Sequence, residues 1–145
     1  MTMNTVDFLI TQWKLSDLNP GDTVLIHSSL KNISQYLHKN GYKFTVEDIF
    51  NSFQIAIGDN GTLLFPLFNF EFPNTNFFDI KNSKSQMGSL SEYARNHSES
   101  FRTGHPIYSF AVIGRNAHFF KDIDNISGYG MDSPFAILKE LDGKI

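Results

Sequence analysis

Apolar positions along the chain follow two periods, and the period changes several times between the first residue and the last. From residue 6 to residue 18 they recur every three to four residues, which predicts an amphipathic helix. Residues 23–27 and 62–66 are short, nearly continuous apolar runs, as expected for strands buried on both faces. Residues 107–113 predict a third such strand. The pattern therefore indicates three buried strands with helical segments around them.

Capping residues predict where the clearer helices begin. Thr45 and Asp48 have the spacing of a capping box, and the helix that follows them, residues 46–57, stops at a glycine. Near the end of the sequence, Ser133 and Pro134 supply an N-cap and a first helical residue for a helix that reaches residue 141. Both helices follow segments that read as strands or loops.

Two weaker helices complete the prediction. One covers residues 89–96 and is opened by Ser89 and Glu92, which also have capping-box spacing, and the other covers 115–122. Strands that alternate with helices favour an α/β fold, with a central, mostly buried sheet flanked by helices. Residues 67–86 form a long Asn- and Phe-rich loop, and loops of that length are commonly functional.

Composition narrows the class of protein. The formal net charge is −3, and no segment is rich in Lys or Arg, which argues against a nucleic-acid partner. The absence of Cys excludes disulfides, thiolate metal sites and a Cys nucleophile. The start lacks a signal-peptide pattern, and no apolar run is long enough for a membrane span, so a soluble, cytoplasmic protein is expected. The fifteen Phe residues support a core and make self-association plausible.

The segment His27-Ser28-Ser29-Leu30-Lys31, at the exit of the first predicted strand, is the most suggestive for chemistry. In open α/β sheets, ligands bind at the carboxyl ends of strands. Two small hydroxyl residues there allow a phosphate to approach the backbone N–H groups of a helix start, and a lysine adds positive charge. The alternative is that the two serines only cap a helix and that the histidine is structural.

Two other segments have weaker signals. Pro106 forces His105 toward an extended backbone ahead of a strand, which suits an imidazole that binds or relays a proton, although a single histidine is more often structural. Gly128 and Gly130 precede the helix that Ser133 opens, so they leave room for a ligand at its positive end. The other histidines, His38, His97 and His118, have no partner at metal-ligand spacing and are expected at the surface.

Taken in order, five stretches resemble the antibiotic N-acetyltransferase family, best known for the aminoglycoside 3-N-acetyltransferases. Each stretch is short, but together they run in the family's order across nearly the whole sequence. The matching stretches are residues 21–30 (Gly-Asp-Thr-Val-Leu-Ile-His-Ser-Ser-Leu), 58–66 (Gly-x-x-Gly-Thr-Leu-Leu-Phe-Pro), 87–90 (Met-Gly-Ser-Leu), 102–114 (Arg-x-x-His-Pro-x-x-Ser-Phe-Ala-x-x-Gly) and 133–145, which starts with Ser-Pro and ends with Leu-Asp-Gly-Lys-Ile.

The resemblance implies an N-acetyltransferase with acetyl-CoA as donor, no metal, and an amine of an aminosugar or aminoglycoside as acceptor, hence an antibiotic-resistance type of transferase. It implies that one segment lies against the CoA phosphates and pantetheine, that a second runs beside the pantetheine arm, and that a serine before the last helix helps to close the groove. The cofactor-binding residues expected on this basis are His27, Ser28, Ser29, Leu30, Lys31, His105, Ser109, Phe110, Ala111 and Ser133.

The sequence also departs from the family. Members place their general-base His, with a nearby carboxylate, beyond the position of Ile145, so no catalytic residue is assigned among the five histidines. The family's Pro-Thr-Phe-Thr at the end of the second strand reads Pro66-Leu67-Phe68-Asn69 here, which changes the acceptor side. The segment 142–145, Asp-Gly-Lys-Ile, is a turn followed by the first step of a strand.

Two functional hypotheses follow. In the first, residues 1–145 are the N-terminal, CoA-binding portion of one acetyltransferase domain that continues beyond Ile145, inactive alone and completed by the missing portion. In the second, the chain is a non-catalytic module that binds CoA or another nucleotide, as a monomer or a homodimer. A metal-dependent hydrolase has no support, because no His, Asp or Glu cluster shows ligand spacing.

Overall fold

A computed structural model describes residues 3–145, and its centre is a four-stranded sheet in the order β1-β2-β4-β3. The strands β1 (Thr23–Leu25) and β2 (Thr62–Pro66) are parallel, whereas β4 (Phe110–Gly114) runs antiparallel to both β2 and β3 (Phe101–Arg102). Every residue of β1 and β2 is buried. The predicted α/β class and the buried central sheet are confirmed, in a mixed rather than a parallel arrangement.

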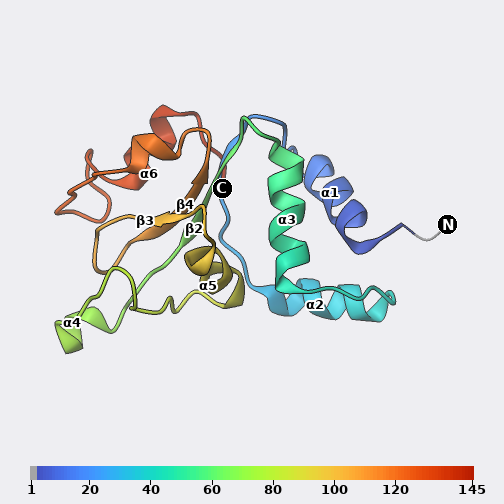
Figure 1. Cartoon of the computed structure of the whole chain (residues 1–145), viewed down its shortest axis with the longest axis horizontal. Coiled ribbons are helices and arrows are strands. Elements are labelled where there is room, and N and C mark those ends of the chain that lie inside the picture. The colour runs from blue at the N-terminus through green and yellow to red at the C-terminus, as the bar shows by residue number, and fades with distance from the viewer. Residues whose placement is uncertain (1–2) are drawn as a thin grey trace.

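Helices cover both faces of the sheet, as Figure 1 shows, with α3 on one side and α6 on the other. In the described residues 3–145, none of the helices is long and apolar enough to cross a membrane. In chain order the helices are α1 (Thr5–Leu15), α2 (Leu30–Lys39), α3 (Val46–Ile57), α4 (Phe72–Thr75), α5 (Ser89–Asn96), the 3-10 helix η1 (Ala117–Phe120) and α6 (Pro134–Glu140).

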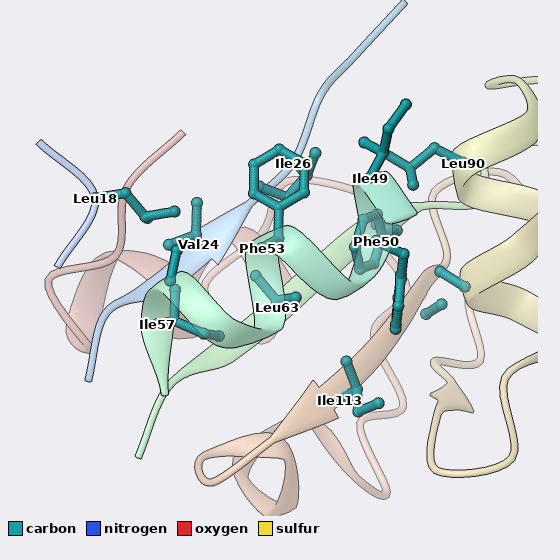
Figure 2. Packing of buried hydrophobic residues seen from close by; sticks show 14 of the residues in the cluster. Leu18, Val24, Ile26, Ile49, Phe50, Phe53, Ile57, Leu63, Leu90 and Ile113 are labelled. Carbon is teal, nitrogen blue, oxygen red and sulfur yellow. The ribbon is translucent and has the colours of Figure 1, made fainter. Parts of the chain in front are cut away.

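The larger core lies between the sheet and α3, which packs through Phe50, Phe53 and Ile57. Figure 2 shows these side chains against Val24, Ile26 and Leu63 of the first two strands. Helix α1 covers the outer side of α3, where the Trp13 ring stacks on Phe53 at 4.3 Å between centroids. The Trp13 indole N–H also donates to the hydroxyl of Ser52 (2.8 Å), so its one polar atom is satisfied on burial.

The smaller core lies on the opposite face of the sheet, where successive side chains of a strand point the other way. It joins Leu25, Leu64 and Phe110 from three strands to Phe120 of η1 and Leu138 of α6. Because β4 is buried on both faces, its neighbouring residues Phe110 and Ala111 belong to different cores.

The strongest local signals in the sequence are confirmed in detail. Thr45 accepts a hydrogen bond from the N–H of Asp48 while the Asp48 carboxylate accepts from the N–H of Thr45, which is a complete capping box. Helix α3 ends before Gly58, whose φ of 64° is easily reached only by glycine. Ser133 is the N-cap of α6, with Pro134 as the first helical residue.

Three element predictions are wrong in their details. Gly88, not Ser89, precedes the first residue of α5, and the Glu92 carboxylate binds Arg95 and the Ser85 N–H rather than capping the helix. The predicted strand at 107–113 begins only at Phe110, because residues 107 and 109 pair irregularly with residues 69 and 67. The predicted helix at 115–122 shrinks to the single 3-10 turn of η1.

Lys144 extends the sheet on the outer side of β1, as the sequence suggested for a strand's first step. It forms an isolated parallel bridge with Val24, donates its N–H to Thr23 and accepts from the N–H of Leu25. Its ammonium group binds the carboxylates of Asp17 (3.3 Å) and Asp22 (2.9 Å), and these contacts raise the pKa of Lys144. The residue therefore connects the sheet edge to the turn before β1.

Candidate functional site

The carboxyl ends of β1 and β2 lie at one edge of the sheet, because these strands are parallel. The chain leaves β1 through His27 and enters α2 at Leu30, and the described side chains of His27, Ser28 and Ser29 are exposed there. The antiparallel β4 begins at the same edge, since Phe110 pairs with Pro66 at the end of β2. This edge is the place where α/β sheets usually bind ligands.

Two segments far apart in sequence form a groove at this edge. Residues 28–31, at the start of α2, face residues 86–90, at the start of α5, across a hollow of about 340 Å³. We refer to these two segments as the helix-start groove. It opens into a larger cleft of about 710 Å³, and both hollows are lined by Ser28, Ser29, Leu30 and Leu90.

The helix-start groove offers backbone donors and positive charge. In α2 and α5, the side chain of the N-cap residue accepts no hydrogen bond from the helix. The first N–H groups of both helices are therefore not occupied by a cap side chain. Residues 28–31 and 86–90 contain Lys31 but no Asp or Glu. Aligned peptide dipoles and free N–H groups favour an anion at such a position.

The adjoining cleft is mainly apolar. Its walls include Trp13 and Phe53 from α1 and α3, Val24 of β1, and Ile26 and His27 directly after that strand. An elongated ligand with an anionic end and a long, weakly polar arm would match the groove and the cleft together.

The other predicted site residues lie elsewhere. Among the described residues that line the groove and the cleft, none is His105, Ser109, Phe110, Ala111 or Ser133. The ring Nδ1 of His105 accepts from the N–H groups of Ile107 (3.2 Å) and Tyr108 (3.0 Å), so this buried histidine shapes its own loop. The structure thus brings residues 27–31 together and buries the other five away from the lining of the groove and the cleft.

Arg102 is a charged residue that binds one of these five, Ser109. Its guanidinium donates to the Ser109 hydroxyl (2.9 Å) and to the carbonyl oxygens of Leu67 (3.2 Å) and Ser83, and it stacks over the Phe78 ring at 4.8 Å. Burial lowers the pKa of Arg102 to about 10. One side chain from β3 therefore fixes both ends of the long 67–86 loop, which has only the short helix α4 within it.

The room expected beside Gly128 is already filled. A Cβ at this position would lie 2.3 Å from the Tyr108 ring, so the glycine is needed to admit that ring rather than a ligand. A hydrogen bond with Tyr108, followed by partial burial, raises the pKa of the neighbouring Tyr129 phenol. The interpretation of the Gly-Tyr-Gly segment as a ligand loop is therefore wrong at Gly128.

Residues 86–90 line the groove but are not among the site residues predicted from the sequence. The signal in the sequence is a glycine, Gly88, directly before a predicted helix; the structure gives it a φ of 105° and shows no side-chain cap there. The juxtaposition with residues 28–31 depends on the packing of α5 against α3, which no local pattern encodes. The described residues include no group of three or more His, Asp or Glu side chains placed to hold a metal ion.

The fold and the groove define an α/β protein with a candidate ligand site at the carboxyl edge of its sheet. The chain belongs to the aminoglycoside 3-N-acetyltransferase family, whose family model matches residues 25–145. The match begins in β1 and includes both segments of the helix-start groove. No curated protein matches the sequence.

Solved structures agree with the family. Aminoglycoside acetyltransferase AAC(3)-Xa matches with a TM-score of 0.81 at 25% identity, over 96% of this chain and 54% of that one. AAC-IIIb in a binary complex with CoASH matches with a TM-score of 0.79 at 23% identity, over 98% and 58%. The YokD protein from Bacillus subtilis matches with a TM-score of 0.79 at 21% identity, over 94% and 61%. The chain thus spans little more than half the length of the structures it matches.

Proposed function

We propose that this chain supplies the donor-binding part of an acetyl-CoA-dependent N-acetyltransferase that acts on an amine of an aminosugar. The observation that carries the proposal is the helix-start groove, which is built for an anion in a chain of this family. The CoASH complex of AAC-IIIb supports a CoA donor, and the complex of AAC-VIa with sisomicin supports an aminoglycoside-like acceptor.

In this proposal the phosphates of CoA lie between the starts of α2 and α5. The N–H groups around Leu30 and Leu90 donate to phosphate oxygens, and Lys31 adds positive charge. The pantetheine arm follows the apolar cleft past Ile26 and His27. We assign the five buried residues that do not line the groove, His105, Ser109, Phe110, Ala111 and Ser133, to the support of this arrangement rather than to direct contact.

The reaction is direct transfer. A base takes a proton from the amine, whose nitrogen attacks the thioester carbonyl and forms a C–N bond. The C–S bond then breaks, and the base returns the proton to the sulfur, so that CoA leaves as its thiol. His105 already accepts two backbone hydrogen bonds through its Nδ1. The matched structures are longer, and we propose that the base comes from polypeptide for which this chain has no counterpart.

A carboxylate placed at the start of α2 tests the donor site. Asp is a good N-cap residue, so Ser29→Asp should keep or raise the stability of α2, whose N-cap makes no side-chain hydrogen bond at present. The same carboxylate would repel a phosphate in the groove. We expect the affinity for CoA, measured by calorimetric titration, to fall roughly tenfold or more, since like charges at close range cost over about 1.4 kcal/mol.

Ser98→Asp is the matched control, because Ser98 is exposed and lies outside the groove. It should bind CoA as the unmodified chain does. Equal CoA affinity in Ser29→Asp and the unmodified chain would overturn the assignment of the phosphate site. Release of free thiol from acetyl-CoA in the presence of an aminosugar then separates a transferase from a module that only binds CoA.

A further inference from the structure

Three aromatic side chains at the same edge of the sheet form a second surface, separate from the groove. The ring centroids of Phe70 and Tyr108 are 6.3 Å apart, and those of Tyr108 and Tyr129 are 4.8 Å apart. Phe70 is 52% exposed and Tyr129 is 65% exposed, so both outer rings face solvent. We refer to Phe70, Tyr108 and Tyr129 as the aromatic shelf.

Half-buried rings hold the shelf in place. Phe68 contacts Phe70 and Tyr108 edge-on at 6.0 Å and 5.2 Å, and Tyr129 stacks on Phe135 at 5.1 Å. The contacts with Phe68 and Phe135 continue into the smaller core through Phe110. Exposed aromatic rings that rest on a fixed core present a rigid surface, which loses little entropy when a ligand binds.

The position of the shelf fits a ligand site. Phe70 follows the carboxyl end of β2 by four residues, and Tyr108 precedes β4 by two, at the edge where β1 delivers His27 to the groove. Tyr129 reaches this edge from the loop before α6. A substrate on the shelf would therefore share an edge of the sheet with the donor site of the proposed function.

The charge of the surrounding loops selects the ligand. Residues 66–72, 105–110 and 123–135, which carry the three rings, contain the exposed carboxylates of Glu71, Asp124 and Asp132 and no Lys or Arg. An ammonium group is attracted both by carboxylates and by the negative faces of aromatic rings, whereas a phosphate is repelled. The polarised C–H groups on one face of a sugar ring also suit an aromatic face.

We infer that the aromatic shelf is the acceptor subsite and that it binds an aminosugar by stacking on its pyranose ring. This inference rests on the proposed function, since it assigns the acceptor of that transferase. It makes Phe70 and Tyr129 specificity-determining residues: they distinguish a cyclic, cationic acceptor from an acyclic amine or a neutral sugar.

The test is a titration of the chain with glucosamine, followed by NMR of side chains labelled in their Tyr and Phe rings. Glucose supplies the ring without the charge, and ethanolamine supplies the charge without the ring. We expect glucosamine to shift the Tyr129 signals and to bind more tightly than either control. Tyr129→Leu and Phe70→Leu should each weaken glucosamine binding roughly two- to fivefold, as for the loss of an exposed cation–π contact.

Phe77→Leu is the matched control, because Phe77 is 65% exposed in the same loop as Phe70 and is not part of the shelf. It should bind glucosamine as the unmodified chain does. An equal loss in Phe77→Leu, equal binding of ethanolamine, or unchanged binding in both shelf variants would overturn the inference. So would the absence of glucosamine binding by the unmodified chain.

A parallel titration with CoA keeps the two proposals distinguishable. If the unmodified chain binds glucosamine but not CoA, only the proposed donor site is contradicted. CoA binding without glucosamine binding would contradict the shelf alone. The shelf variants are expected to bind CoA with unchanged affinity, because Phe70 and Tyr129 do not line the groove or the cleft among the described residues.

Discussion

The helix-start groove and the aromatic shelf lie at one edge of the same sheet and have opposite chemistry. The groove combines backbone N–H groups at two helix starts with Lys31 and has no carboxylate in its segments. The shelf combines three rings with carboxylates and has no lysine or arginine in its loops. One edge can therefore attract two substrates of unlike charge, each to its own end.

The 67–86 loop connects these two regions. It leaves the shelf at Phe70 and returns at Gln86, which lines the groove. The Gln86 side chain accepts from the N–H of Phe70 (2.7 Å), and the Gln86 N–H donates to the carbonyl of Phe68 (3.0 Å). The spacing of the two regions is thus set by hydrogen bonds across the base of this loop and by Arg102 beneath it.

Replacement of Arg102 should disturb both regions and have the largest effect. Arg102→Met would remove the guanidinium donor of the Ser109 hydroxyl and of the Ser83 carbonyl, and it would leave the Leu67 carbonyl with the Ser109 hydroxyl as its remaining side-chain donor. Unsatisfied buried polar groups are costly, so we expect the free energy of unfolding to fall by about 3 kcal/mol. Urea unfolding measures this change. Arg115→Met, at an exposed position, should cost little, and an equal loss there would contradict the role of Arg102.

A methyl group at Gly128 should disturb the shelf alone. In Gly128→Ala the new Cβ would overlap the Tyr108 ring and displace it, which should cost about 2 kcal/mol of stability and weaken glucosamine binding. Gly104→Ala is a close control, because its Cβ would meet its nearest neighbour at an ordinary 3.7 Å. Thermal unfolding and both ligand titrations compare the two variants. Weaker CoA binding in Gly128→Ala would show that the two regions are not independent.

The smallest effect is expected at Glu92, which acts on the groove side. Burial opposes ionisation of Glu92, but hydrogen bonds from Arg95 and the Ser85 N–H outweigh it, so the pKa of Glu92 is lowered. A carboxyl with a lowered pKa in the folded state stabilises the protein above its unfolded pKa, and this contribution is lost as the pH falls through the folded pKa. Screening by solvent keeps it below about 1 kcal/mol.

Unfolding of Glu92→Gln and the unmodified chain, compared from neutral pH downward, measures this contribution. The variant should be the less stable protein at neutral pH, and the two curves should converge as the pH falls through the lowered pKa of Glu92 in the folded state. Glu140→Gln, which changes an exposed carboxylate, should keep the pH dependence of the unmodified chain. Curves for Glu92→Gln that stay parallel to those of the unmodified chain at all pH values would contradict the role of the ionised carboxylate.

The sequence predicted the fold best where its signals are local. The capping box of Thr45 and Asp48 and the glycine stop at Gly58 depend on a few adjacent residues, and the structure reproduces both. The same spacing at Ser89 and Glu92 gave a wrong cap, because Arg95 and the Ser85 N–H compete for that carboxylate. Strand β3 and the antiparallel direction of β4 depend on pairing between distant segments, so no local pattern could give them.

In the site, too, local signals were predictable from the sequence and contacts between distant segments were not. Residues 27–31 were recognisable because a buried strand ends in small hydroxyl residues and a lysine, and the structure places them in the groove. Their partner segment, residues 86–90, comes from the far end of a long loop and is positioned by tertiary contacts. The room predicted at Gly128 was filled by Tyr108, whose approach depends on the same kind of long-range packing.

The bridge between Val24 and Lys144 has a consequence for synthesis on the ribosome. Its two residues are separated by nearly the whole sequence, so the outer edge of β1 stays open until Lys144 has left the exit tunnel. At usual elongation rates this delay is on the order of ten seconds. During that time the N–H of Leu25 and the carbonyl of Thr23 can pair with a neighbouring nascent chain. The bridge therefore covers an edge that is open to pairing with other chains for most of the time that this chain is being made.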